Sequence, residues 1–223
     1  MRALVLISGG QDSATCLALA TREYSEVHTV TFDYGQRHRR ELNCSKTLSE
    51  LAGVKSHTTL TIDTLKQLGG SSLMDHGTSV DGTHDRDKTL PATFVPGRNL
   101  VFLTLAAAKA YQLGIDNLIT GVCQTDYSGY PDCRNTSIKS IQVAISLCFG
   151  KDINIHTPLM WKTKAETIQI MQSLGKIDWY KYSHTCYQGQ YPPCGVCPAC
   201  SIRAEGFRVA GVEDPLLSEK EVR

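Results

Sequence analysis

The sequence predicts an α/β fold, in which a parallel, doubly wound sheet carries helices on both faces and a small cysteine-rich knuckle follows it. Short apolar runs alternate along the chain with longer segments of helical character, as in folds built from strand–helix–strand units. From residue 184 onward this alternation stops, and four cysteines fall within fifteen residues. We therefore expect one α/β domain over residues 1–182 and a small cysteine-organised region over residues 183–223.

Length and composition limit the classes of protein to consider. The chain has 223 residues, of which 41% are hydrophobic and 20% are charged, as is typical of a soluble globular protein. The net charge of +1 counts against a protein that binds nucleic acid or a membrane through basic charge. No apolar run approaches the roughly 20 residues of a membrane-spanning helix. The run at residues 3–7 is shorter than the core of a signal peptide, about 7–15 residues, so a cytoplasmic location is expected.

The first half of the chain contains three expected strands and two expected helices. Residues 3–7 are apolar throughout and end at Ser-Gly-Gly, which is typical of a strand buried on both faces of a sheet. Leucines and alanines that share one face mark the two helices, and Gly53 ends the second. In chain order, the expected elements are a strand at 3–7, a helix at 13–22, a strand at 27–32, a helix at 36–51 and a strand at 56–62.

Residues 65–93 have no sustained hydrophobic period and contain two polar, glycine-containing stretches, at residues 69–72 and 81–88. A connection of this length is usually either functional or disordered. We interpret it as a lid over a site, and the alternative is a solvent-exposed insertion.

The second half resumes the alternation of strands and helices. Residues 98–113 are strongly apolar, include three consecutive alanines and end at Gly114, which predicts a helix packed on the sheet. In chain order, the expected elements are a helix at 98–113, a strand at 117–122, a helix at 135–149, a strand at 153–156 and a helix at 164–174.

Residues 8–13, with the sequence SGGQDS, join the first strand to the first helix. The start of a helix has unpaired N–H groups and the positive end of the helix dipole, so it binds anions such as phosphate. The two glycines allow a tight turn and a close approach of the backbone, and the serines add hydroxyl donors. The segment is neither a Walker A loop nor a Gly-x-Gly-x-x-Gly loop. In a phosphate site Asp12 would hold Mg²⁺, and the alternative is a plain turn in which a serine or Asp12 caps the helix.

Three further segments contain candidate binding residues. Residues 32–38 follow the second strand, and ligands of doubly wound sheets bind beyond the carboxyl ends of strands. Arg98 falls in the first turn of a helix, where its charge opposes the dipole and hints at an anionic partner. Lys164, also near a helix start, is long enough to reach a phosphate. The alternatives are an ordinary loop and helix cap at residues 32–38, and solvent-facing side chains for Arg98 and Lys164.

Residues 121–134 follow another buried strand and combine two tyrosines, two aspartates and an arginine in one turn. A guanine-like ring presents adjacent N–H donors, which a carboxylate accepts as a pair, and a flat face on which a tyrosine stacks. Asp126, Tyr130 and Asp132 are the candidates for these contacts. Cys123 and Cys133 are either nucleophiles or small buried apolar residues, of which the second is the commoner role.

Four of the nine cysteines, Cys186, Cys194, Cys197 and Cys200, are spaced to share one metal ion. Close-set cysteines in a reducing compartment point to a metal or to catalysis more than to disulfides. Four thiolates favour Zn²⁺ in a closed structural site, and the intervening glycines and prolines favour the tight turns of a knuckle. The alternatives are an iron–sulfur cluster and a redox pair, although a pair does not explain four cysteines. His184 is a further ligand or, because four thiolates complete the shell, a surface or site histidine.

These segments carry two resemblances. The SGGQDS segment resembles the pyrophosphate loop of the N-type ATP pyrophosphatases, the PP-loop superfamily, which implies a Rossmann-like, adenine nucleotide alpha hydrolase-like fold. The whole set resembles the QueC family of 7-cyano-7-deazaguanine synthases, which act in queuosine precursor biosynthesis. Residues 65–93 and the tail after Arg208 carry little of this match. The matching segments are SGGQDS at 8–13, FDYGQRH at 32–38, FVPGRN at 94–99, TGVCQTDYSGYPDCR at 120–134, TPLMW at 157–161, KAE at 164–166, and CY with CGVCPAC between 186 and 200.

The family resemblance implies an ATP-dependent ligase that converts 7-carboxy-7-deazaguanine and ammonia into the nitrile. The implied route runs through an adenylated acid, an amide and an adenylated amide, and uses ATP, Mg²⁺ and one structural Zn²⁺ per chain. The implied enzyme is a homodimer that acts on small molecules and has no nucleic-acid or membrane partner. The alternatives are a relative that stops at the 7-amido-7-deazaguanine amide, a tRNA-modifying PP-loop adenylating enzyme, and a zinc-knuckle binding protein with a vestigial nucleotide fold.

The same resemblance, together with the reasoning above, assigns roles to residues of this sequence. The expected catalytic residues are Asp12, Ser13, Arg98 and Lys164. The expected ATP-binding residues are Ile7, Ser8, Gly9, Gly10, Gln11, Asp12, Ser13, Ala14, Thr15, Cys16, Leu17, Arg98, Gly121 and Lys164. The expected substrate-binding residues are Asp126, Tyr130, Asp132 and Arg134, and the expected zinc ligands are Cys186, Cys194, Cys197 and Cys200.

Overall fold

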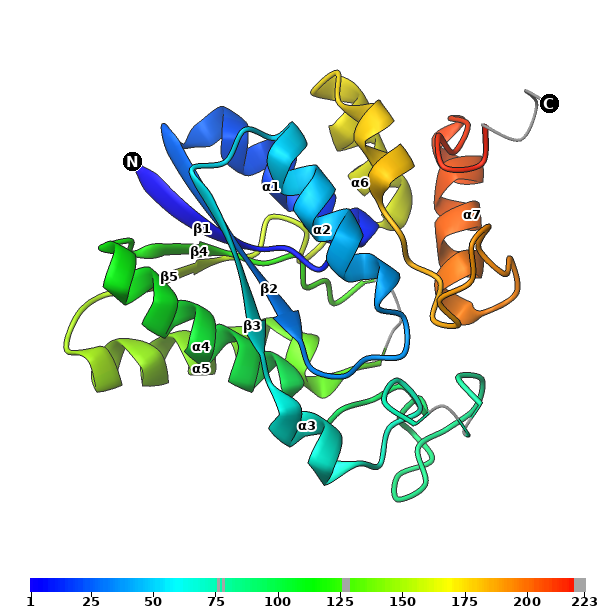
Figure 1. Ribbon diagram of the computed structural model, residues 1–223, viewed down its shortest axis with the longest axis horizontal. Helices are drawn as coiled ribbons and strands as arrows, with labels where there is room; N and C mark the ends of the chain where they lie inside the picture. Colours follow the sequence, from blue (N-terminus) through cyan, green and yellow to red (C-terminus); the bar gives the residue numbers. More distant parts are fainter. Residues whose placement is uncertain (76, 78, 126–128, 219–223) are drawn as a thin grey trace.

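The structure, a computed structural model, describes residues 1–75, 77, 79–125 and 129–218. Within them, five parallel strands form one sheet in the order β3-β2-β1-β4-β5. The chain runs from β1 outward to β2 and β3, and then returns to the other side of β1 for β4 and β5 (Figure 1). This arrangement confirms the predicted doubly wound sheet. The strands are β1 (Arg2–Leu6), β2 (Glu26–Asp33), β3 (Ser56–Thr61), β4 (Asn117–Ile119) and β5 (Asn154–His156).

The central strand, β1, is apolar throughout because both of its faces are buried. Ala3 and Val5 belong to one core cluster, and Leu4 belongs to the other. Successive side chains of a strand point to opposite faces, so one apolar run supplies both cores. Val5 pairs with Thr29 of β2 and with Ile119 of β4, which places β1 in the middle of the sheet.

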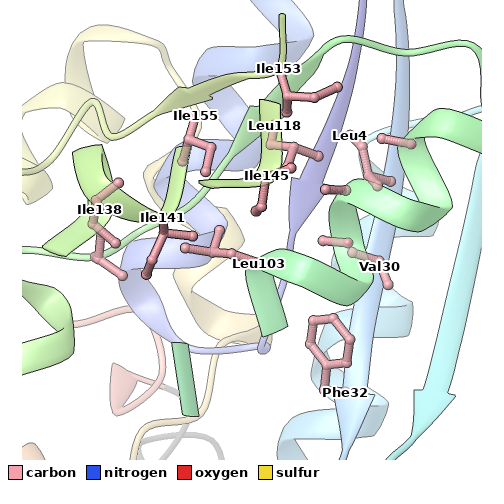
Figure 2. Close-up of a cluster of buried hydrophobic side chains, with 14 of the residues drawn as sticks. Leu4, Val30, Phe32, Leu103, Leu118, Ile138, Ile141, Ile145, Ile153 and Ile155 are labelled. Carbon is pink, nitrogen blue, oxygen red and sulfur yellow. The ribbon is translucent and has the colours of Figure 1, made fainter. Parts of the chain in front are cut away.

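Two helices, α4 (Arg98–Leu113) and α5 (Asn135–Phe149), cover one face of the sheet and have the predicted bounds (Figure 1). Their apolar side chains meet those of the strands in a common core (Figure 2). Leu103 of α4 and Ile138 of α5 are each only 1% exposed. Complete burial of such a side chain stabilises the fold by about 1.5–3 kcal/mol relative to an exposed position.

The opposite face is covered by α1 (Gln11–Glu23), α2 (Arg40–Leu51) and α6 (Lys164–Ser173) (Figure 1). A capping box starts α6, in which the Thr163 hydroxyl accepts from the Glu166 N–H and the Glu166 carboxylate accepts from the Thr163 N–H. A further helix, α7 (Pro198–Ala210), packs against α6, and its Phe207 reaches the same core. None of the helices in the described part of the chain is long and apolar enough to cross a membrane.

Several element bounds differ from the predicted ones. Helix α2 begins at Arg40, not at residue 36, because the Gln36 side chain folds back on the preceding turn. Its Oε1 accepts from the Tyr34 N–H and its Nε2 donates to the Phe32 carbonyl. β4 ends at Ile119, and the residues after it leave the sheet. The elements that were not predicted are α3 (Asp63–Leu68), the 3₁₀ turns at Pro131–Cys133 and Ile177–Tyr182, and α7.

The described residues of the segment 65–93 are partly packed against the rest of the molecule. Leu65 and Leu73 are buried in the core beside α4, and Val80 is buried against the cysteine cluster. The Ala92 N–H donates to the Gly82 carbonyl and closes the segment into a short hairpin. These contacts do not fit a simple solvent-exposed insertion. The role of the segment as a lid stays a prediction.

Truncation of a core leucine measures how much the packing of α4 on the sheet contributes to the stability of the fold. We expect Leu103→Ala to lower the free energy of unfolding by about 2–5 kcal/mol, because it removes apolar contacts and leaves a cavity. The matched control is Leu68→Ala, since Leu68 is 74% exposed at the end of α3. The control is expected to change stability by no more than about 0.5 kcal/mol. Urea unfolding followed by circular dichroism measures both, and equal effects would contradict the described core.

Candidate active site

A cleft of about 310 Å³ opens where the carboxyl ends of β1, β2 and β4 meet. The chain leaves β1 and β4 for opposite sides of the sheet at this point, and doubly wound sheets bind their ligands at such a switch point. The loop at residues 8–13, the turn at 32–38 and the segment after β4 all contribute to the wall. The expectation that these separate segments face one crevice is therefore confirmed.

One end of the cleft is formed by the loop at residues 8–13, which bonds to itself. The Ser13 hydroxyl accepts from the Ser8 N–H at 3.2 Å and donates to the Gly10 carbonyl at 2.9 Å. The Gly10 N–H donates to the Ser8 hydroxyl at 3.2 Å. Gly10 is the N-cap of α1 and forms no side-chain cap, so the alternative in which a serine or Asp12 caps the helix is wrong. The first-turn N–H groups of α1 can therefore bind an anion.

The two glycines of the loop have different roles. Gly9 has a φ of +93°, and a Cβ atom there would lie 2.3 Å from the Glu41 carbonyl oxygen of α2. The missing side chain of Gly9 thus allows the predicted tight turn and lets the loop pack against α2, and its part in the approach of a phosphate stays a prediction. Gly121, in the segment after β4, allows the same kind of close packing against the start of α1, since a Cβ there would lie 3.1 Å from the Asp12 carbonyl carbon.

Two predicted catalytic residues, Asp12 and Lys164, form an ion pair at this end. The Lys164 Nζ lies 2.8 Å from Oδ1 and 2.7 Å from Oδ2 of Asp12, and both side chains are largely buried. Lys164 therefore lines the cleft, and the alternative of a solvent-facing lysine is wrong. Gly206 of α7 lies against the lysine stem, because a Cβ there would be 2.5 Å from the Lys164 Cγ. Packing of α7 on α6 thus helps to aim Lys164 at Asp12.

The other end of the cleft is aromatic and contains Arg98. The phenol rings of Tyr34, Tyr130 and Tyr187 line it, and the Arg98 guanidinium carbon lies 5.6 Å from the centre of the Tyr130 ring. Burial alone would lower the pKa of Arg98, but the neighbouring phenol groups, Tyr34 first, raise it above its ordinary value. Arg98 is a positive charge inside the cleft wall, so the alternative of a solvent-facing arginine is wrong.

The turn at residues 121–134 contributes fewer cleft residues than predicted. Tyr130 lines the cleft, and its hydroxyl bonds with that of Thr93 at 2.5 Å. Asp132 is absent from the described wall, because its Oδ2 accepts from the Asn99 N–H at the start of α4. Arg134 is exposed to solvent. The predicted ligand-binding residue Asp126 lies outside the described residues.

The two cysteines of this turn both contribute to the cleft wall. Cys123 is buried, and its sulfur lies 3.2 Å from the Lys162 carbonyl oxygen. The Cys133 sulfur accepts from the Asn99 side-chain amide at 3.3 Å. The structure thus places both thiols in the wall, where they fit the packing role of small residues better than that of activated nucleophiles.

Most of the expected ATP-binding residues line the cleft, but five do not. These five are Gly9, which packs against α2, and the residues after the first turn of α1, which are Ala14, Thr15, Cys16 and Leu17. The reason is geometric, since only the first turn of a helix that points at a site can contact the ligand. Burial, with a smaller contribution from Asp12, raises the pKa of the Cys16 thiol well above its ordinary value.

The cleft wall contains residues that sequence analysis did not assign to the site. The His38 Nε2 lies 3.2 Å from the Glu41 carboxylate, and both residues line the cleft. Tyr187 and Arg203 reach the wall from the C-terminal region. The matched segment FDYGQRH contains His38, and Glu41 follows it at a helical spacing of three. Tyr187 is next to a predicted zinc ligand, but nothing local marks Arg203.

The four clustered cysteines form a site for one metal ion. Their sulfur atoms all lie within 4.8 Å of one another, and the residues range from half-buried to buried. Cys194 and Cys200 have sulfurs 3.9 Å apart, and the edge of a tetrahedron with Zn–S bonds of 2.3 Å is about 3.8 Å long. A multi-iron cluster would need its ligating sulfurs farther apart. The donor set thus fits zinc, and Cys197 is the N-cap of α7.

His184 is not part of this metal site. It is 1% exposed, and its Nε2 donates to the Gln190 carbonyl at 2.8 Å. Its backbone N–H donates to the Gly9 carbonyl at 2.9 Å. The interpretation as a surface histidine is therefore wrong, because the residue links the loop at residues 8–13 to the C-terminal region.

Comparison with known proteins adds to this geometry. A family model described as "Queuosine biosynthesis protein QueC" matches residues 2–211. A relative from Chromobacterium violaceum, named 7-cyano-7-deazaguanine synthase, is 52% identical over 97% of this chain and 93% of its own length. A second relative, from Bacillus subtilis and also named 7-cyano-7-deazaguanine synthase, is 48% identical over 92% of this chain and 93% of its own length.

A solved structure supports the fold alone. The NMN synthetase from Francisella tularensis is similar to this chain with a TM-score of 0.51 at 13% sequence identity. The similarity covers 99% of this chain and 78% of that one. At this level of identity it shows a shared doubly wound architecture and says nothing of the ligand.

Loss of one cysteine ligand tests the metal site. We expect the purified chain to contain one zinc ion and Cys197→Ser to contain none, with a lower melting temperature, because metal binding stabilises the folded state. The control is Cys148→Ser, which removes an exposed cysteine of α5 outside the cluster. Elemental analysis and thermal unfolding measure both variants. A zinc-free Cys197→Ser protein with the stability of the wild type would contradict a structural zinc site.

Proposed function

Because the chain belongs to the QueC family of queuosine biosynthesis proteins, we propose that it is an ATP-dependent 7-cyano-7-deazaguanine synthase. The observation that carries the proposal is one cleft with two unlike ends. One end has the open helix start and Lys164, which suit the phosphates of ATP, and the other has tyrosines and Arg98, which suit a flat, anionic ring. The proposed reaction joins 7-carboxy-7-deazaguanine to ammonia and forms the nitrile.

The proposed chemistry uses two ATP molecules in two successive adenylation steps. A carboxylate oxygen attacks the α-phosphorus of ATP, pyrophosphate leaves, and ammonia then displaces AMP to form the amide. The amide oxygen attacks the α-phosphorus of a second ATP, a second pyrophosphate leaves, and loss of AMP and of both amide protons leaves the nitrile. Each carboxylate oxygen therefore ends in one AMP. The chain mainly has to hold two anions together and screen their charges.

The residues of the cleft supply this screening. The first-turn N–H groups of α1 would bind pyrophosphate oxygens, and Ser13 would add its hydroxyl. The Asp12 carboxylate suits Mg²⁺, which prefers oxygen ligands and usually accompanies ATP. When the nucleotide binds, Lys164 would exchange its pairing with Asp12 for a phosphate oxygen. The low exposure of the cleft wall would help to exclude water from an adenylate.

The finer features implied by the family are part of the same proposal. We propose that the enzyme is a cytoplasmic homodimer and that small molecules alone are its substrates. A relative that stops at the amide would use the same residues, since one activation step and two need the same cleft. The products therefore decide between the two reactions.

An isotope experiment tests the double activation. Acid labelled with ¹⁸O in both carboxylate oxygens is incubated with ammonium, Mg²⁺, ATP and the enzyme, and the products are analysed by mass spectrometry. We expect an unlabelled nitrile and two labelled AMP molecules for each nitrile. Accumulated amide with one labelled AMP would indicate the one-step relative. Label in inorganic phosphate would contradict adenylation, and unchanged acid would overturn the proposed substrate.

Removal of the Asp12 carboxylate tests the phosphate end. We expect Asp12→Ala to lower the rate of AMP formation by at least about 100-fold, because the variant loses a magnesium ligand and the partner of Lys164. The control is Asp63→Ala, since Asp63 lies in the first turn of α3 and is exposed. Steady-state kinetics and circular dichroism follow both variants. An active Asp12→Ala enzyme would show that the assignment of the loop is wrong.

A further inference from the structure

The cleft contains a carboxylate for which the proposed chemistry so far has no use. Glu41 lies in the first turn of α2 and lines the cleft, with a side chain that is only 14% exposed. Its Oε2 lies 3.2 Å from the His38 Nε2. An acidic side chain that is largely withdrawn from water needs a partner, and His38 supplies one contact to the carboxylate.

The other acidic residues near the cleft are already engaged. Among the described residues, Asp12 and Glu41 are the acidic side chains of the wall. Both oxygens of Asp12 contact the Lys164 Nζ, at the phosphate end. Asp132 bonds the start of α4 through the Asn99 N–H. Glu41, whose partner is the neutral or weakly basic His38 side chain, is therefore the carboxylate of the described wall that is not paired with a lysine or arginine and can bond a ligand.

Glu41 lies near the phenol groups of the aromatic end. Burial raises the pKa of the Tyr34 phenol, the Arg98 guanidinium lowers it, and the Glu41 carboxylate raises it further. The same two charges act on Tyr187, whose pKa burial raises well above its ordinary value. The ring centres of His38 and Tyr187 are 6.0 Å apart. The carboxylate, the guanidinium and the tyrosine rings all line the same cleft.

The position of Glu41 is fixed from two sides. Its backbone carbonyl occupies the space that a side chain of Gly9 would need. A Cβ at Gly189 would lie 3.2 Å from the His38 Cα, so the loop after Cys186 packs directly against His38. His38 is 3% exposed, and its Nδ1 has no hydrogen-bond partner among the described residues. The packing at Gly9 and Gly189 thus holds both members of the Glu41–His38 pair in place.

We propose that Glu41 is the residue that recognises the guanine-type edge of the substrate ring, and that His38 holds it in place. The ring of 7-carboxy-7-deazaguanine presents N1–H and a 2-amino group side by side, and a carboxylate accepts from both. Adenine presents an acceptor nitrogen at the equivalent position, which a carboxylate repels. Glu41 therefore selects the guanine-type ring at this end and disfavours adenine there. This inference rests on the proposed function.

The proposal is tested by the ratio of kcat/KM values for two substrates that differ in one hydrogen-bond donor. The value of kcat/KM is measured for 7-carboxy-7-deazaguanine and for the analogue that lacks the 2-amino group. A hydrogen bond to a charged group corresponds to a preference of roughly 10- to 100-fold, which we expect of the wild-type enzyme. In Glu41→Gln, the preference should fall to less than about 3-fold, because the amide accepts one bond and opposes the second donor. A merely structural role of Glu41 would leave the ratio unchanged.

Two further variants sharpen the test. Glu50→Gln is the matched control and is expected to keep the wild-type ratio, since Glu50 is an exposed glutamate of the same helix, α2, and is not part of the cleft wall. Glu41→Asp keeps the negative charge, and it replaces Glu41→Gln in the measurement if Glu41→Gln does not fold. Its shorter side chain should miss the paired donors and reduce the preference at least about 3-fold. An unchanged ratio in a folded Glu41 variant would overturn the proposal.

The remaining outcomes separate this inference from the proposed function. A wild-type enzyme that converts both acids equally would overturn the role of Glu41 and leave the synthase reaction intact. A wild-type enzyme that converts neither acid would overturn the proposed function itself. A Glu41→Gln enzyme with a raised KM for ATP and an unchanged ratio would place the nucleotide ribose beside Glu41, which also overturns the inference.

Discussion

The close packing of the loop at residues 8–13 against α2 is the constraint on which the rest of the site depends. At Gly9 there is no room for a side chain, because a Cβ would lie 2.3 Å from the Glu41 carbonyl oxygen. The Gly9 carbonyl also accepts from the His184 N–H. One residue thus joins the loop to α2 and to the C-terminal region. Any side chain at Gly9 would have to displace α2, and Glu41 with it, from the position that brings the carboxylate to the cleft.

The metal site and the phosphate site are connected through α7. Cys197 is the N-cap of this helix, and Gly206, further along it, packs against the stem of Lys164. Between them, Arg203 is 4% exposed and bonds Asp214 at 2.6 and 2.8 Å. A buried ion pair of this geometry holds the helix in one orientation, because loss of either partner would leave an unpaired charge. A zinc ion bound by the four cysteines would order the start of α7 and thereby contribute to the position of a lysine in the cleft.

The charges of the cleft suit two anionic substrates that must meet. At one end, Lys164 and the start of α1 would offset the phosphates of the proposed nucleotide, and Asp12 is the negative group that a divalent cation would use. At the other, Arg98 lies among tyrosine rings, and Glu41 adds a negative charge that a guanine-type ring can bond. A cleft with only positive charge would bind both anions tightly without ordering them. Opposite charges at fixed positions give each substrate one orientation.

Local signals in the sequence determined the strands, most helices and the metal ligands. The apolar run of β1 predicts a strand buried on both faces, a helix-ending glycine marks α4, and the cysteine spacing alone predicts one shared metal ion. The loop at residues 8–13 could likewise be predicted as an anion-binding segment, because the residues that give it this character are consecutive in the sequence. The tertiary structure alone decided which side chains meet across the cleft. Asp12 meets Lys164 from 152 positions away, Glu41 and Tyr187 line one cleft, and Asp132 bonds the start of α4. The physical reason is that such pairs depend on how helices pack on the sheet, and no local pattern records that packing.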